Sequence, residues 1–227
     1  MSPQTSIQSR LGSVRQSLPD GVGLVAVSKF HPVEALREAR EAGQRLFGES
    51  RVQELAAKVA ELGSEDYCWH FIGHLQTNKV KQLLRLRPAL IESVDSVRLL
   101  EEIDREAVRQ GIVQNVLMQL HVAREETKFG FTPEELLAWF GGRGFEKLQA
   151  VHVCGVMGMA SNTDDTARIE ADFKAIRSVY DRILVDCPDL RGFSTVSMGM
   201  SDDYPMAVEC GSTLVRVGSA IFGPREY

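Results

Sequence analysis

Eight short apolar runs alternate with longer amphipathic stretches along the chain, and this order constrains the fold more than any other feature of the sequence. The apolar runs lie at residues 23–28, 45–50, 67–73, 90–95, 115–122, 148–158, 193–199 and 214–223. Strict alternation of strand and helix favours a parallel sheet in which the helices form the crossovers. Eight such units predict an α/β fold of the (β/α)₈ barrel type, and a doubly wound open sheet is the alternative.

Residues that commonly begin and end helices support these boundaries. Pro32 and Gly43 bracket the helical stretch 32–43, and Thr132 to Glu135 form a capping-box pattern at the start of another helix. An opening amphipathic segment predicts an N-terminal helix at about residues 5–18. No linker, repeat or low-complexity tract divides the chain, so we expect a single domain over residues 1–227.

Composition and charge argue against several classes of protein. The 227 residues are 44% hydrophobic and 25% charged, with a net charge of −5, which offers no electrostatic footprint for nucleic acid or an anionic membrane. No segment approaches the roughly 18 apolar residues of a membrane span or the pattern of a signal peptide. The four cysteines are scattered and lack metal-ligand spacing, so we expect free thiols, no metal site and a reducing, cytoplasmic location.

Lys29 follows the apolar run 24–27 at the expected carboxyl end of the first strand. Active sites of both candidate folds lie at that end of the strands. A lysine whose amine loses water there has a lowered pKa, and the neutral amine attacks carbonyl carbons to form Schiff bases. The alternative is a lysine whose side chain extends to solvent from a strand end. Position alone leaves both interpretations open.

The loops after the last two predicted strands resemble the places where barrels build phosphate sites. We expect Ser201 to cap the helix that follows it, with Asp202 and Asp203 in the first turn of that helix. Gly218 and Ser219 offer two more amides and a hydroxyl. Together with Lys29, these residues predict a site for a phosphorylated carbonyl compound.

Arg216 is a cation between Val215 and Val217 near the end of the eighth predicted strand. One interpretation is structural, with the guanidinium pairing with a carboxylate inside the barrel. The adjacent glycine and serine make a contact with the ligand the favoured interpretation.

Several motifs together resemble one known family over nearly the whole chain. They are VAVSKF, FGESRVQE, WHFIGHLQTNKVK and SMGMSDDYPMAVECGSTLVRVGSAIFG. These stretches closely resemble the pyridoxal 5′-phosphate homeostasis proteins, which share the N-terminal barrel of alanine racemase (the type III fold of pyridoxal phosphate enzymes) and bind the cofactor as a Schiff base. The resemblance implies that Lys29 is the Schiff-base lysine and that Ser201, Gly218 and Ser219 hold the phosphate. It also implies that Arg216 faces the pyridine nitrogen.

Three further positions follow from the same resemblance. The family pattern reads FGEN where this chain has Phe47 to Ser50, so Ser50 is the counterpart of an asparagine expected near the ring oxygen of the cofactor. The shorter serine puts that contact in doubt. His74 and Asn78 fall in the motif IGHLQTNK near the expected mouth of the site, and we assign neither a catalytic role.

The resemblance implies a carrier more than a catalyst. Alanine racemase completes its site with a second, β-rich domain and a dimer partner, and this sequence ends a few residues after its last predicted strand. We therefore expect a monomer that stores, buffers or delivers pyridoxal 5′-phosphate to apo-enzymes, without robust catalysis. The alternatives are a racemase or lyase that uses the same cofactor, a Schiff-base aldolase, and an interaction scaffold.

Overall fold

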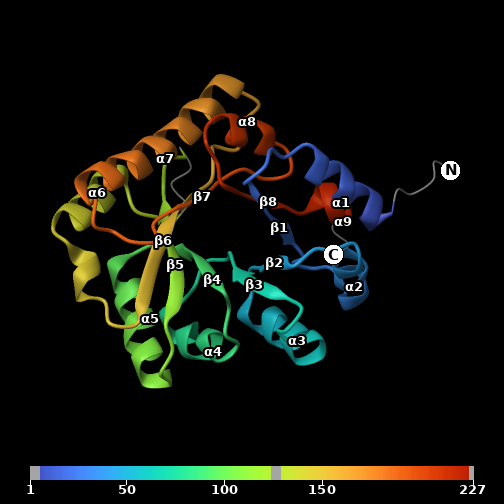
Figure 1. The fold of residues 1–227 in the computed structure, drawn as a ribbon, viewed down its shortest axis with the longest axis horizontal. Helices are drawn as coiled ribbons and strands as arrows, with labels where there is room; N and C mark the ends of the chain where they lie inside the picture. Colours follow the sequence, from blue (N-terminus) through green and yellow to red (C-terminus); the bar gives the residue numbers. More distant parts are fainter. Residues whose placement is uncertain (1–5, 124–128, 225–227) are drawn as a thin grey trace.

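The eight strands form a closed parallel barrel, so the (β/α)₈ prediction is confirmed and the open sheet is excluded. The computed structural model describes residues 6–123 and 129–224. The strands follow one another around the barrel in chain order (Figure 1). They are β1 (Gly23–Val27), β2 (Leu46–Glu49), β3 (Cys68–Phe71), β4 (Leu90–Val94), β5 (Gln114–Leu120), β6 (Val151–Gly158), β7 (Thr195–Ser197) and β8 (Leu214–Val217).

Helices surround the barrel and cover the outer faces of the strands (Figure 1). In chain order they are α1 (Ile7–Gln16), α2 (Val33–Glu41), α3 (Val52–Leu62), the 3₁₀ turn η1 (Thr77–Lys79), α4 (Val80–Arg85), α5 (Val97–Gln110), α6 (Pro133–Gly141), η2 (Gly144–Lys147), α7 (Thr166–Asp186), α8 (Tyr204–Glu209) and α9 (Ser219–Phe222). Within the described residues, none of these helices combines the length and the apolar character needed to cross a membrane.

Local sequence signals set the ends of several helices as expected. The hydroxyl of Thr132 accepts a hydrogen bond from the Glu135 amide, and the Glu135 carboxylate accepts one from the Thr132 amide, which is a complete capping box. Gly111 ends α5 in the left-handed conformation (φ 62°). The opening amphipathic segment contains α1, which packs beside the short α9, and the Arg10 guanidinium donates to the carbonyl of Ile221 at 2.6 Å.

The interior of the barrel has an apolar floor. Five strands each contribute one side chain to this floor: Val25, Leu90, Leu117, Met157 and Leu214. Residues two positions further along a strand point to the same side and lie closer to its carboxyl end. Glu92 and Arg216 therefore form part of a second, polar layer above this floor.

A glycine allows one irregular step in the barrel wall. Gly155 has φ 155°, and a β-carbon there would lie 1.8 Å from the carbonyl oxygen of Thr195 on β7. The register between β5 and β6 shifts at this point. The backbones of β6 and β7 thus approach too closely for any side chain at position 155.

Gly155→Ala should lower the free energy of unfolding by well over the ~1 kcal/mol that is typical of a point substitution, because the wall must open to admit a methyl group. Urea unfolding measures this loss. Gly12→Ala is the matched control, since it adds a methyl group to a helix with no atom within 4 Å of the new carbon. It should raise stability by about 0.5–1 kcal/mol. Equal effects of the two substitutions would contradict the close approach.

Candidate functional site

The carboxyl ends of β1, β2, β7 and β8 bring the predicted site residues to one rim of the barrel. Ala26 is in register with Val217 on β8, and Val27 is in register with Gly48 on β2. Lys29 lies two residues beyond the end of β1, in a half-buried turn. Ser50 directly follows β2 and Gly218 directly follows β8, so both flank the segment that carries Lys29.

Gly218 lies against the end of β1. A β-carbon on Gly218 would lie 3.2 Å from the carbonyl oxygen of Val27, so the two backbones are in close contact. Ser219 begins α9, and its side chain is exposed at the rim. The turn after β8 therefore presents its first amides beside the turn that carries Lys29.

The hydroxyl of Ser201 binds this same turn. It accepts hydrogen bonds from the amides of Gly218 at 3.1 Å and Ala220 at 3.4 Å. The expectation that Ser201 caps the next helix is therefore wrong. It bridges to α9 instead, because β7 and β8 are neighbours and the loops that follow them meet.

The two aspartates after Ser201 also differ from the expectation. The helix α8 begins only at Tyr204, so Asp202 and Asp203 precede its first turn. A carboxylate oxygen of Asp203 accepts a hydrogen bond from the amide of Met200 at 2.6 Å, within the same loop. Asp203 therefore shapes the loop after β7, and the hydroxyl of Ser201 bridges this loop to the next.

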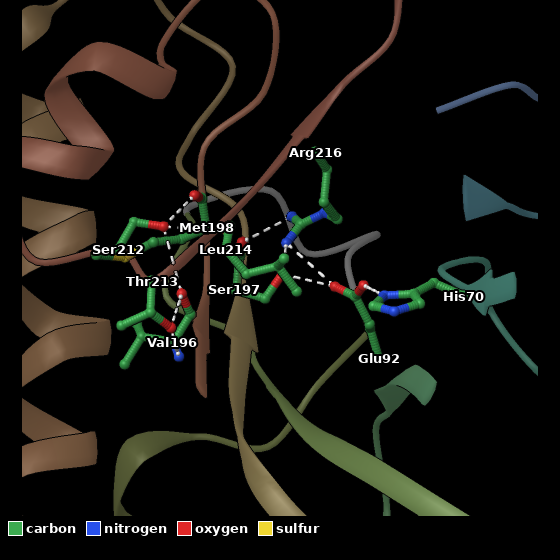
Figure 2. Close-up of polar contacts among 10 residues, drawn as sticks. His70, Glu92, Val196, Ser197, Met198, Ser212, Thr213, Leu214 and Arg216 are labelled. Atoms are coloured by element: carbon green, nitrogen blue, oxygen red, sulfur yellow. Dashed lines mark hydrogen bonds and ion pairs between the residues drawn. The ribbon is translucent and has the colours of Figure 1, made fainter. Parts of the chain in front are cut away.

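Arg216 lies inside the barrel, 4% exposed, in a polar network that Figure 2 shows. Its guanidinium donates to the Ser197 hydroxyl at 2.6 Å and to the carbonyl of Gly158 at 3.1 Å. The Ser197 hydroxyl donates to the Glu92 carboxylate at 2.6 Å, and the guanidinium lies 3.7 Å from the same carboxylate oxygen. Arg216 thus pairs with a carboxylate inside the barrel, which was the less favoured of its two interpretations.

The network continues to His70 on β3. Nδ1 of its ring lies 2.7 Å from the other carboxylate oxygen of Glu92, and both side chains are buried. Burial favours the neutral ring, but the hydrogen bonds of His70 with Cys68 and Glu92 outweigh it and raise the pKa of His70 to about 9. Burial also opposes the charge of Glu92, but His70, Arg216 and Ser197 overcome it and lower the pKa of that carboxyl. The network therefore holds two cations around one carboxylate.

A raised pKa for His70 makes stability depend on pH in a defined direction. Its usual value is 6.5, so its stabilising effect is complete below pH 6.5 and is lost as the pH rises through 9. The free energy of unfolding should fall over this range by at most about 1.4 kcal/mol per pH unit. Urea unfolding at several pH values measures the slope. His70→Gln should flatten the slope; an unchanged slope in this variant would contradict the assignment.

The remaining predicted positions lie on the β2 and β3 side of the rim. The backbone of Ser50 approaches Gly73 so closely that a β-carbon on Gly73 would lie 2.0 Å from the carbonyl oxygen of Ser50. His74 stacks on Phe129, with ring centroids 3.7 Å apart, and its Nδ1 lies 2.8 Å from a carboxylate oxygen of Asp95. Asn78 is exposed in η1. The structure thus gives His74 structural partners.

Sequence reasoning missed His70, Glu92 and Ser197. The available signal was a polar residue two positions after an apolar one within a strand, as in Leu90 and Glu92. That spacing places both side chains on one face of the strand, but only closure of the barrel makes the face an interior.

Comparison with known proteins places the chain in a family. Residues 4–226 match the family model described as "Alanine racemase, N-terminal domain". Proteins named "Pyridoxal phosphate homeostasis protein" are similar over most of their length. The one from Helicobacter pylori strain J99 is 38% identical over 201 residues, which cover 88% of this chain and 87% of that protein. The one from Aquifex aeolicus is 39% identical over 208 residues, which cover 90% and 87%. The chain belongs to the pyridoxal phosphate homeostasis protein family.

Solved structures agree with this membership. PipY of Synechococcus elongatus, whose structure is known without and with PLP bound, is 40% identical. Each superposition covers 96% of this chain and 100% of PipY. The TM-score is 0.90 for the structure without PLP and 0.88 for the structure with PLP bound. Alanine racemase from Clostridium difficile shares the fold alone, at 14% identity and a TM-score of 0.75, over 95% of this chain and 55% of the racemase. The homeostasis family therefore has the barrel of alanine racemase.

Proposed function

We propose that this protein binds pyridoxal 5′-phosphate covalently through Lys29 and serves vitamin B6 homeostasis by storing, buffering or delivering the cofactor. The observation that carries the proposal is the meeting of β1 and β8 at one rim, where the Lys29 turn adjoins the Gly218 turn. Membership in a family in which PipY has PLP bound supports the identity of the ligand.

The residues after β7 and β8 suit the phosphate group of the cofactor. Their candidate donors are the hydroxyls of Ser201 and Ser219 and the amide of Ser219, because the amides of Gly218 and Ala220 donate to Ser201. Gly218 permits the close packing of this turn on β1. Amides and hydroxyls at a barrel rim after the last two strands are the usual phosphate ligands of this architecture.

Arg216 supports a carrier more than a catalyst. We propose that its guanidinium faces the pyridine nitrogen, with Glu92, Ser197 and the carbonyl of Gly158 fixing its position. A guanidinium beside that nitrogen keeps it unprotonated, and the ring is then a poor electron sink. Ser50, on the neighbouring strand end, is the proposed contact on the side of the ring oxygen, directly or through water.

Pyridoxal 5′-phosphate supplies an aldehyde that condenses with a primary amine. The role of the chain is to present that amine at the rim of the barrel, from which the cofactor passes to apo-enzymes. We further propose that the protein works as a cytoplasmic monomer. The four cysteines, which form no disulfide, support a reducing compartment.

The test is an absorption spectrum of the purified protein with pyridoxal 5′-phosphate, followed by borohydride reduction and peptide mapping. We expect a visible absorption band that reduction removes, and one pyridoxyl group on Lys29. A label on another residue, or none, would overturn the proposal.

A second experiment tests for catalysis. In deuterated water, the loaded protein should not exchange the α-proton of added amino acids; rapid exchange would favour a racemase or lyase.

A further inference from the structure

Three ionisable side chains, two buried and one half-buried, form a cluster beside the Lys29 turn, and the proposed function has not used them. Lys58 on α3 is 4% exposed, and Glu49 at the end of β2 is fully buried. The Lys58 ammonium donates to carboxylate oxygens of Glu49 and Glu54, each at 2.8 Å. We call these residues the Glu49–Glu54–Lys58 cluster.

The cluster holds the peptide groups on both sides of Lys29. On one side, the Lys58 ammonium donates to the carbonyl of Ser28 at 2.8 Å. On the other side, the amide of Phe30 donates to a carboxylate oxygen of Glu54 at 2.6 Å. The hydroxyl of Ser28 also donates to the Glu49 carboxylate at 2.6 Å. The backbone of Lys29 is therefore fixed at both ends by side chains from β2 and α3.

The turn adopts an uncommon conformation. Phe30 has φ 68°, in the left-handed region that residues with a β-carbon rarely enter. The Glu54 carboxylate accepts a hydrogen bond from the amide of Phe30. This bond holds the backbone in a conformation that is otherwise unfavourable.

A need for stability alone explains such a cluster poorly. Removing three charges from water costs much of what their attraction returns, so buried ion pairs are weak stabilisers. Burial raises the pKa of Glu49 to about 7, against the opposite influence of Lys58 and Ser28. The second carboxylate oxygen of Glu49 has no hydrogen-bond partner among the described residues. What the cluster provides is a fixed geometry next to Lys29.

We propose that Glu54 and Lys58 are positioning residues, which hold the Lys29 backbone so that the side-chain amine is directed to the aldehyde of the cofactor. This inference rests on the proposed function. In the condensation, the nitrogen lone pair of Lys29 forms a bond to the aldehyde carbon. The aldehyde oxygen leaves as water with two protons, and nothing is oxidised or reduced. Restricting the amine to a productive orientation favours this step.

Two ligands separate positioning of the amine from binding of the rest of the cofactor. Pyridoxal 5′-phosphate can condense with Lys29, whereas pyridoxine 5′-phosphate has an alcohol in place of the aldehyde and cannot. Glu54→Ala should weaken the affinity for the aldehyde by roughly tenfold to a hundredfold, the equivalent of one lost hydrogen bond to a charged group. It should leave the affinity for the alcohol within about twofold. Calorimetric titration measures both ligands, and reductive labelling of Lys29 provides an independent readout.

Two further variants complete the test. Glu54→Gln keeps an oxygen that accepts the Phe30 amide, so it should restore most of the affinity for the aldehyde. Glu61→Ala is the matched control on the same helix, since Glu61 forms an exposed ion pair with Arg37, and it should bind both ligands normally. Should Glu54→Ala fail to fold, Glu54→Asp carries the same comparison, because its shorter side chain withdraws the carboxylate from Phe30.

The inference fails if folded Glu54→Ala or Glu54→Asp binds the aldehyde as the wild type does, or loses affinity for both ligands equally. The proposed function fails in a different way, because the wild-type protein itself would then give no reducible label on Lys29. The two failures are thus distinguishable within one set of measurements.

Discussion

Glu92→Ala should lower the free energy of unfolding by about 3–5 kcal/mol, the usual cost of removing one partner from a buried ion pair. The substitution leaves the guanidinium of Arg216 and the imidazolium of His70 inside the barrel without their shared carboxylate. It also removes the acceptor of the Ser197 hydroxyl. Urea unfolding monitored by tryptophan fluorescence measures the loss.

Two controls separate charge from size. Glu170→Ala breaks an exposed ion pair with Lys174 on α7 and should cost less than about 1 kcal/mol. Glu92→Gln keeps the shape and should cost less than Glu92→Ala while still losing the charge. A loss below about 1 kcal/mol for Glu92→Ala would mean that the two cations find other partners, or that His70 loses its proton on folding.

Lys29→Ala should abolish the borohydride-trapped pyridoxyl label completely and leave only weak, reversible binding through the phosphate and the ring. Lys29→Arg should do the same, because the guanidinium keeps the charge but has no nucleophilic amine near neutral pH. Lys29 lies in a half-buried turn, so both variants should keep the free energy of unfolding within about 1 kcal/mol of the wild type.

Mass spectrometry of the reduced protein measures the label. Lys81→Ala, which removes an exposed lysine at the start of α4, should label fully and serves as the control. Label that persists in Lys29→Ala would place the reactive amine elsewhere. Lys58 is then the residue to examine, because its amine lies next to the same turn.

The order of strands and helices could be predicted from the sequence because each signal is local. Apolar runs mark the strands, and residues such as Thr132 and Gly111 mark helix ends within a few positions of themselves. The position of Lys29 at a strand end follows from the same pattern. The placement of this lysine beside Gly218 required only the rule that the first and last strands of a barrel are neighbours.

The polar partners could not be predicted, because they depend on contacts far apart in the sequence. Ser201 was expected to act on the helix after it, but it bonds Gly218 from the neighbouring strand. Lys58 lies in an amphipathic helix, where its spacing from Glu54 indicates an ordinary ion pair on one helix. That its ammonium also reaches the carbonyl of Ser28 follows only from the packing of α3 on β2, beside the turn after β1.

The carboxylate of Glu92 also limits how such a barrel can acquire new chemistry over evolution. With Arg216 beside the pyridine nitrogen, as proposed, an acidic residue in its place would favour a protonated ring. That residue would face Glu92 across the interior, and Glu92 would lose a cation that helps to keep it ionised. A lineage would have to alter both positions together, and each single change passes through a less stable intermediate. An acidic residue at position 216 therefore calls for a second change at Glu92.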